Sequence, residues 1–135
     1  MKKILVGTDT TASADLAVQT AGELARLADA ELIVVHVRAN GASHDAADPR
    51  KAADPERYLA EIPRRFPHVA VRTLTENGDA ADRLVELAES ERADTIVLGN
   101  RGTHGSWWRV RDSVPNIVLR HAPCSVFIVD TRTAQ

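Results

Sequence analysis

The feature that most constrains the fold of this 135-residue chain is the alternation of short strand-like runs with segments of helical spacing. Runs that are apolar throughout are typical of strands buried on both faces of a sheet. Strand-like runs occupy residues 4–6, 31–37, 69–75, 94–99 and 123–130. Parallel strands need a long, right-handed crossover between them, usually a helix. The order therefore predicts an α/β fold with one parallel sheet and helices on both faces.

Two helices are expected in the first half of the chain. Apolar residues recur at helical spacing over residues 14–28, and Ser13 is the expected N-cap. Asp54-Pro55 supplies a cap and a first turn for a second, short helix. Since proline lacks an amide proton and clashes with the preceding turn, Pro63 and Pro67 are expected to end that helix early.

The remaining segments complete the predicted alternation. Residues 38–54 show no periodicity and are expected to form a mobile loop rather than a domain linker, because too little chain precedes them. A single domain over residues 1–135 follows from the length. Asp79 is expected to cap the third helix, and Ser113, with Pro115 in the first turn, the fourth.

Composition excludes several classes of partner. The net charge is −2 and aromatic residues make up 4%, so neither a basic field for nucleic acid or anionic membrane nor a stacking platform for bases is expected. No apolar window approaches the length of a membrane span, and the N-terminal apolar run is too short for a signal peptide. The single cysteine, Cys124, suits a reducing compartment. We expect a soluble, cytoplasmic protein.

Ligands of such sheets bind in the crevice at the carboxyl ends of the strands, where the strand order reverses. Here those ends carry the sequences GTD at residues 7–9 and GNRG at residues 99–102. Glycines let the backbone approach an anion, and the helix expected to begin at Ser113 offers free amides and a favourable dipole. The pattern predicts a phosphate-binding loop.

Other polar residues have ordinary structural interpretations. Asp9 has an equal interpretation as a turn or capping residue at the end of the first strand, and Trp107-Trp108 are interpreted as loop anchors or a contact surface. His36 is interpreted as a core histidine with its hydrogen bonds satisfied, and Cys124 as a small buried apolar residue. There is no metal-ligand spacing, no nucleophile with a nearby base and no Walker-type lysine, so we expect no enzyme, although slow ATP hydrolysis is not excluded.

The loop resembles the nucleotide loop of the universal stress protein family, whose pattern is glycine, two residues, glycine, nine residues, then glycine and serine or threonine. Gly99, Gly102 and Ser113 occupy three of the four places. The likeness extends over most of the chain, and only residues 38–68 lack a clear counterpart. The resemblance implies a Rossmann-like, five-stranded parallel sheet of order 3-2-1-4-5, with ATP bound in many members between strands one and four.

The resemblance also implies roles for individual residues. Asp9 matches an acidic position near the nucleotide, with Gly7 and Thr8 lining the cleft, and Val37 matches a residue whose backbone contacts adenine. Further matches are Leu98 and Gly99 beneath adenine and ribose, and Gly102, Ser113 and the Val114 amide around the phosphates.

Asp112 stands where the family pattern has its third loop glycine. A carboxylate about 4 Å from a phosphate, at an effective dielectric of about 20, costs about 4 kcal/mol, which is about three decades in affinity. Arg101, Arg109 and Arg111 in the same loop could neutralise it, Mg²⁺ could bridge it to a phosphate, or the carboxylate could turn away and cap the helix.

Three functions therefore stay open. The first is a stress-response regulator or sensor that binds ATP, with magnesium, and performs little or no catalysis. The second is a universal stress protein that binds no nucleotide and acts as a module for an unknown protein partner because of Asp112. The third is a cyclic-nucleotide binder, since a single phosphate would reach less far toward Asp112.

The last strand would lie at an edge of the sheet in the implied order. Its residues Val126, Phe127, Ile128 and Val129 are all apolar, and a bare apolar edge invites pairing with another strand. The resemblance implies a homodimer through this strand, with the two sheets meeting antiparallel.

Overall fold

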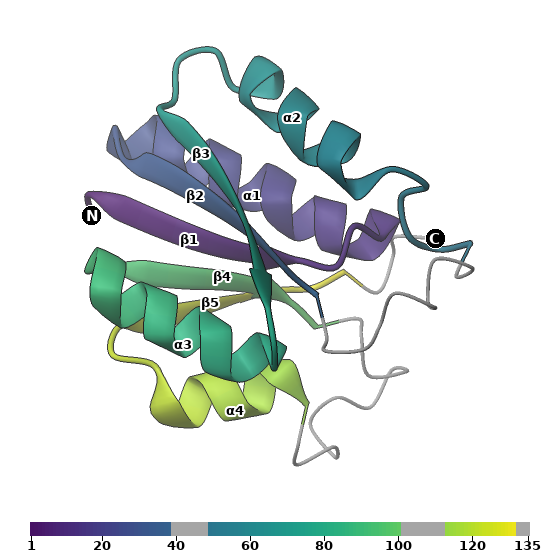
Figure 1. The fold of residues 1–135 in the computed structure, drawn as a ribbon. Helices are drawn as coiled ribbons and strands as arrows, with labels where there is room; N and C mark the ends of the chain where they lie inside the picture. The colour runs from purple at the N-terminus through teal and green to yellow at the C-terminus, as the bar shows by residue number, and fades with distance from the viewer. Residues whose placement is uncertain (39–48, 101–112, 132–135) are drawn as a thin grey trace.

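The computed structural model describes residues 1–38, 49–100 and 113–131. Strands and helices alternate along the chain, as the sequence predicts (Figure 1). In order they are β1 (Lys3–Thr8), α1 (Ala12–Ala28), β2 (Glu31–Arg38), α2 (Pro55–Arg65), β3 (Val71–Asn77), α3 (Ala80–Glu91), β4 (Thr95–Gly99), α4 (Val114–His121) and β5 (Ser125–Val129).

All five strands belong to one parallel sheet of order β3-β2-β1-β4-β5, which is the order implied by the resemblance. β1 is the central strand, and its Ile4 lies in register with Leu32 of β2 on one side and Thr95 of β4 on the other. Strand order therefore reverses at β1, because the chain first builds outward to β3 and then returns to add β4 and β5. Such a reversal opens a crevice at the carboxyl ends of β1 and β4.

Helices cover both faces of the sheet and create two separate cores. α1 and α2 cover one face, α3 and α4 the other (Figure 1). Along β1 the side chains of Ile4 and Val6 enter the first core and that of Leu5 enters the second, and all three are fully buried. Since successive strand residues point to opposite faces, a strand in the middle layer must be apolar throughout.

Helix N-caps are mostly those expected from the sequence. The side chains of Asp54, Asp79 and Ser113 each accept a backbone hydrogen bond at the start of a helix. The expectation for the first helix was wrong, because Thr11 rather than Ser13 is the cap: Thr11 has an extended backbone and its Oγ1 accepts from the Ala14 amide at 3.2 Å. Ser13 already lies in the first helical turn.

The second helix does not stop at Pro63, contrary to expectation, but continues to Arg65 and ends before Pro67, as expected for that proline. A proline in the last turn removes only one intrahelical hydrogen bond. Burial of Leu59, Ile62 and Phe66 against the first core compensates for it, since each such side chain contributes about 1.5–3 kcal/mol. The third strand begins at Val71, two residues later than expected.

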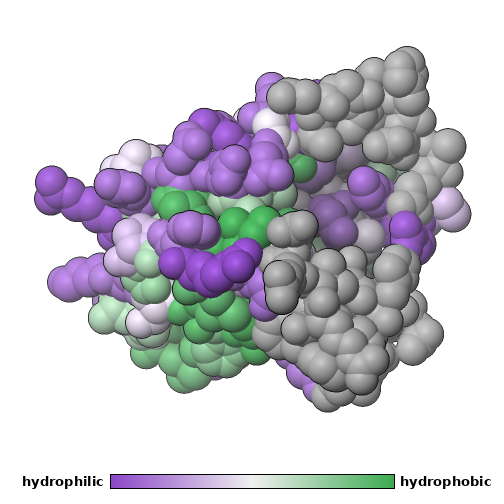
Figure 2. Space-filling model, turned by 90° about the horizontal axis from the view of Figure 1, so that it is seen from below, coloured by the Kyte–Doolittle hydropathy of each residue, from purple (hydrophilic) through white to green (hydrophobic). Residues whose placement is uncertain are grey.

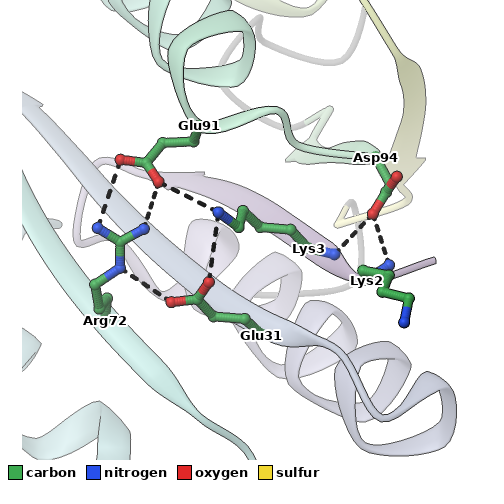
Figure 3. A network of polar contacts seen from close by, with 6 residues as sticks. All are labelled: Lys2, Lys3, Glu31, Arg72, Glu91 and Asp94. Atoms are coloured by element: carbon green, nitrogen blue, oxygen red, sulfur yellow. Dashed lines mark hydrogen bonds and ion pairs between the residues drawn. The ribbon is translucent and has the colours of Figure 1, made fainter.

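An ionic network closes the amino end of the sheet (Figure 3). The Arg72 guanidinium of β3 contacts Glu31 of β2 at 3.0 Å and Glu91 of α3 at 2.5 Å. Lys3 of β1 lies between the same two carboxylates, at 3.7 and 3.5 Å. Arg72 is the main reason why the pKa of Glu91 lies below its usual range. Partly exposed pairs of this kind contribute little singly, but here they join three strands and a helix.

Asp94, just before β4, completes this end of the fold. Its Oδ2 accepts hydrogen bonds from the backbone amides of Lys2 and Lys3, at 2.6 and 2.8 Å. The same amides set the pKa of Asp94 below its usual range. At the amino end of the sheet these charged side chains and amides are thus paired with one another. The carboxyl end of the sheet is therefore the better candidate for a ligand site.

Gly22 of α1 is required by the packing of Phe66. A Cβ placed on Gly22 would lie 2.2 Å from a ring carbon of Phe66. An exposed helical glycine usually gains about 0.5–1 kcal/mol when replaced by alanine. Here we expect the opposite: Gly22→Ala should lower the free energy of unfolding by about 1–3 kcal/mol, measured by urea denaturation.

Leu27→Ala, on the same helix, is the matched control. Leu27 is 73% exposed, so its truncation should change stability by less than about 0.5 kcal/mol. A Gly22→Ala protein more stable than the wild type would contradict the packing argument.

Candidate functional site

The carboxyl ends of β1, β2 and β4 bring together most of the described residues that the sequence singled out. Gly7 and Thr8 end β1, Leu98 and Gly99 end the neighbouring β4, and Val37 lies near the end of β2 on the other side of β1. Asp9 follows β1, and Ser113 and Val114 begin α4. Gly102, Asp112, Arg101, Arg109, Arg111, Trp107 and Trp108 lie outside the described residues.

Asp9 organises the turn between β1 and α1. Its Oδ1 accepts from the Thr11 amide at 3.0 Å and from the Thr11 hydroxyl at 2.6 Å. Thr11 in turn caps α1. The turn role that the sequence allowed for Asp9 is therefore confirmed, while the carboxylate remains exposed at the edge of the sheet. A ligand contact by Asp9 stays a prediction.

Thr10, which the sequence did not single out, has the least expected backbone of this turn. Its φ is +68°, a conformation that is rare for a β-branched residue and costs about 1–3 kcal/mol. The residue is buried, its amide donates to Thr8 Oγ1 at 3.0 Å, and its own hydroxyl accepts from the Ala52 amide at 3.1 Å. In the sequence, the only indication of this unusual backbone is that the chain must reverse direction between the end of β1 at Thr8 and the helix cap at Thr11.

The main chain of Val37 faces β1. The Glu31 amide donates to Lys2 of β1, whereas the Leu32 amide donates to Ala70 on the β3 side. Because main-chain groups alternate along a strand, those of Val37 point the same way as those of Glu31, toward β1. β1 ends at Thr8, in register with His36, so β2 extends beyond it. The Val37 carbonyl is therefore the first acceptor of β2 beyond the ladder with β1.

Ser113 begins α4, the helix that follows β4 in the chain. The Ser113 side chain is buried and accepts from the Asn116 amide at 3.4 Å, and its carbonyl accepts from Ile117. Pro115 has no amide proton. Within the described ranges, this leaves the Val114 amide as the first-turn donor without a helical acceptor, at the positive end of the helix dipole. That arrangement suits an anion.

The end of β4 is held by a pair of buried residues. Asn100 Oδ1 accepts from the amide and the hydroxyl of Thr131, at 3.1 and 3.3 Å, and the Asn100 amide donates to Val129. A Cβ on Gly99 would lie 2.9 Å from the Thr131 methyl group, so only glycine fits there without a shift. The Leu98 side chain is buried in the second core, so a ligand beneath it would meet the main chain.

His36 differs from the sequence interpretation. It is only partly buried, and among the described residues its Nδ1 is buried without a hydrogen-bond partner, so the expectation of a satisfied core histidine was wrong. Burial lowers the pKa of His36, and the nearby cations Arg38 and Lys51 lower it further, against a smaller opposing effect of Asp9. The imidazole is therefore held in its neutral form at neutral pH.

The described residues were also compared with the requirements of a metal site, a reactive thiol and a membrane span. No group of three or more metal-ligating side chains occurs among residues 1–38, 49–100 and 113–131. Cys124 is half-buried beside the second core, and burial raises the pKa of its thiol, which keeps it protonated. No described helix is long and apolar enough to cross a membrane.

Comparison with known proteins agrees with the fold. The model of the universal stress protein family matches residues 1–130. A universal stress protein of Mycobacterium tuberculosis is 33% identical, and the match covers 96% of this chain and 97% of that protein. A universal stress protein crystallised in complex with cAMP superposes with a TM-score of 0.77 at 29% identity, covering 96% of this chain and 97% of the other. UspA of Lactobacillus plantarum gives 0.78 at 25% identity, with 95% and 97% covered.

The lowered pKa of His36 makes stability depend on pH. Below its ordinary pKa of 6.5 the unfolded chain binds a proton that the folded chain resists, so stability should fall as pH drops from about 6.5 through the lower folded pKa. His36→Val should remove this part of the loss, which urea denaturation at about pH 7.5 and pH 5 would measure. His68→Gln, at an exposed histidine, should leave the loss unchanged. Parallel stability curves for the wild type and His36→Val would refute the assignment.

Proposed function

The chain belongs to the universal stress protein family, and we propose that it is a stress-response regulator or sensor that binds an adenine nucleotide with little or no catalysis. The nucleotide would lie at the carboxyl ends of β1 and β4, with ATP and magnesium as the principal ligand. The observation that carries this proposal is that β2 and β4 flank the central strand: the Val37 carbonyl of β2 lies beyond the ladder with β1, and β4 precedes the helix start at Ser113.

The open Val37 carbonyl favours adenine over other purines. The exocyclic amine of adenine is a hydrogen-bond donor, whereas guanine and hypoxanthine carry a carbonyl at the same position. A main-chain acceptor fixed by a sheet therefore matches the first and repels the other two. The half-buried Val37 side chain packs at the margin of the second core and keeps the strand end in place.

The α4 start favours the phosphates. The Val114 amide and the dipole of an eight-residue helix offer a partial positive charge at the carboxyl end of the sheet. The related protein in complex with cAMP supports a phosphate-bearing adenine ligand in this fold, and it favours the cyclic-nucleotide alternative for this chain as well. ATP needs more anion-binding groups than one phosphate does, and these would come from the loop that contains Gly102 and Asp112.

A regulatory rather than catalytic role fits the groups present. In the described part of the site, the side chains nearest to the strand ends are threonines, an exposed carboxylate held by Thr11, and a histidine held neutral. The Thr11 hydroxyl does donate to the Asp9 carboxylate, but the same hydroxyl caps α1 by accepting from the Ala14 amide, which is a structural role. Since the lone thiol of Cys124 suits a reducing compartment, the proposal includes the cytoplasm.

The non-binding alternative rests on the charge of Asp112. If that carboxylate repels the phosphates, the same fold would act as a module that contacts a protein partner, with the tryptophans and arginines of the loop as contact residues. This alternative and the nucleotide proposal differ in whether the Asp112 carboxylate prevents the phosphates from binding.

The proposal also includes a homodimer through β5. Of the two edges of the sheet, β3 carries Arg72 and Glu76, both engaged in ion pairs, whereas β5 has no charged residue. Charged residues protect an edge strand from pairing. Phe127 of β5 and Leu119 of α4 are 43% and 47% exposed, and apolar residues gather in the lower half of the view from the side of α4 (Figure 2). A second copy pairing along β5 would cover that edge.

ATP with magnesium should raise the melting temperature of the wild type, because a ligand that binds only the folded state stabilises it. At about a hundred times the dissociation constant the gain is about 2.7 kcal/mol, or several degrees. Asp112→Gly should bind ATP more tightly, by up to about three decades. Thermal scanning with ATP, and with cAMP in competition, measures both. Native mass spectrometry would identify any co-purified nucleotide.

Ser113→Ala should reduce the shift caused by ATP, each protein being compared with its own ligand-free form because the variant also loses a helix cap. Ser90→Ala, at an exposed serine of α3, is the matched control. If ATP shifts only the Asp112→Gly protein, the wild type is a non-binding member. If neither ATP nor cAMP shifts either protein, the nucleotide proposal is wrong.

Phe127→Asp should convert the dimer into a monomer, because a carboxylate placed at an apolar pairing edge would be desolvated. Sedimentation equilibrium gives the oligomeric state. Leu27→Asp, on an exposed face of α1, is the control and should leave the dimer intact. A monomeric wild type at about 100 μM, well above typical dimer dissociation constants, would rule out the dimer.

A further inference from the structure

His36 lies near the carboxyl edge of the sheet, and its buried Nδ1 has no hydrogen-bond partner among the described residues. The residue is in register with Thr8 of β1 and Thr75 of β3, so two threonines lie beside it on the same face of the sheet. In the neutral imidazole one ring nitrogen carries no proton, and a buried Nδ1 can stay in that state. Protonation puts a proton on both nitrogens, which makes Nδ1 a buried donor without an acceptor.

The surroundings of His36 oppose its protonation. Burial has the largest effect, and the charges of Arg38, on the same strand, and of Lys51, in the segment 49–54 that leads into α2, add to it. Asp9, which follows β1, favours the protonated form, but its effect is the smallest of these. The neighbouring strands β1 and β3 place uncharged threonines beside the ring. An imidazolium at this position is therefore repelled on balance.

Segment 49–54 is tied to the same edge of the sheet by a hydrogen bond that spans 42 positions of sequence. The Ala52 amide donates to Thr10 Oγ1 at 3.1 Å. Thr10 is buried and has a positive φ of 68° in the turn that follows β1. Strained backbone conformations persist where surrounding contacts hold them. The segment that carries Lys51 therefore also supports the turn that contains Asp9.

We propose that His36 is an acid-sensitive switch: its protonation releases segment 49–54 from Thr10 and so changes the shape of the carboxyl edge of the sheet. Release removes both costs of protonation, because it takes Lys51 away from the imidazolium and lets water reach Nδ1. The turn around Thr10 then loses a bond that holds it. The switch needs no bound nucleotide, so it goes beyond the proposed function and is tested without a ligand.

The pH range of the switch follows from the direction of the pKa shift. Burial lowers the pKa of His36 below 6.5, and Arg38 and Lys51 lower it further. At neutral pH the ring is therefore neutral and the segment stays bound, and release occurs as the pH falls from 6.5 through the lower folded pKa. Each unit by which the bound segment lowers the pKa of His36 makes protonation favour release by about tenfold.

Amide hydrogen exchange, followed residue by residue with NMR, tests the switch on the intact chain. Between about pH 7.5 and pH 5, the protection factor of the Ala52 amide should fall by about tenfold in the wild type. The amide of Leu5, in the fully buried central strand, should keep its protection over the same range. His36→Gln cannot take up the proton and should keep Ala52 protected at both pH values. An equal loss at Ala52 and Leu5 would mean global unfolding and would contradict a local switch.

Lys51→Glu, at an exposed position, reverses one of the charges that act on His36. A carboxylate there attracts the imidazolium, so His36 should titrate at a higher pH and Ala52 should keep more of its protection at about pH 5 than in the wild type. Arg64→Glu, at an exposed arginine of α2, is the matched control and should behave as the wild type does. The proposal is overturned if His36→Gln loses protection at Ala52 as the wild type does, or if Lys51→Glu and Arg64→Glu change the pKa of His36 equally.

Discussion

The structure depends on the position of β1, which is covered by a hydrophobic core on each face of the sheet and paired with a strand along each edge. Ile4, Leu5 and Val6 have no exposed surface, and the strand is paired with β2 and β4 at once. A strand in that position can continue only as long as both neighbours and both helical layers continue with it. β1 ends at Thr8, and the residues that follow it lead into α1 at the carboxyl edge of the sheet. In open parallel sheets the ligand crevice lies at this edge, where the strand order reverses. The position of the candidate site is a consequence of this central strand.

The two ends of the sheet divide stability and binding between them. At the amino end, charged side chains satisfy one another, and Asp94 takes the amides of Lys2 and Lys3. At the carboxyl end, the Val37 carbonyl lies beyond the ladder with β1 and the Val114 amide begins a helix, and the proposed ligand would use both. Protein contacts that closed the carboxyl end in the same way would add stability but leave no site.

Much of this fold could be predicted from the sequence, because it depends on local signals. Apolar runs such as 31–37 can be buried only as strands of a middle layer, and Asp54, Asp79 and Ser113 are caps whatever the tertiary structure. The prediction at Pro63 was wrong because the sequence pattern does not show that Phe66 packs into the core, in the space left by Gly22 of α1. Thr10 could not be found at all, because threonine disfavours the backbone it adopts, and the bond that holds it comes from Ala52. His36 was misinterpreted because its burial and two of the charges near it, Lys51 and Asp9, depend on parts of the chain that are far from it in sequence.

The two hydrogen bonds between Thr131 and Asn100 fix the position of the chain just after β5. Thr131 is fully buried beside the end of β4, at the carboxyl end of the sheet, whereas the amide of Lys2 is bound at the opposite end (Figure 1). Chain that follows Thr131 therefore starts from the side of the candidate site, whereas Lys2 lies on the far side of the sheet. A probe attached to the side chain of Lys2 would accordingly be kept away from the candidate site by the full length of the strands.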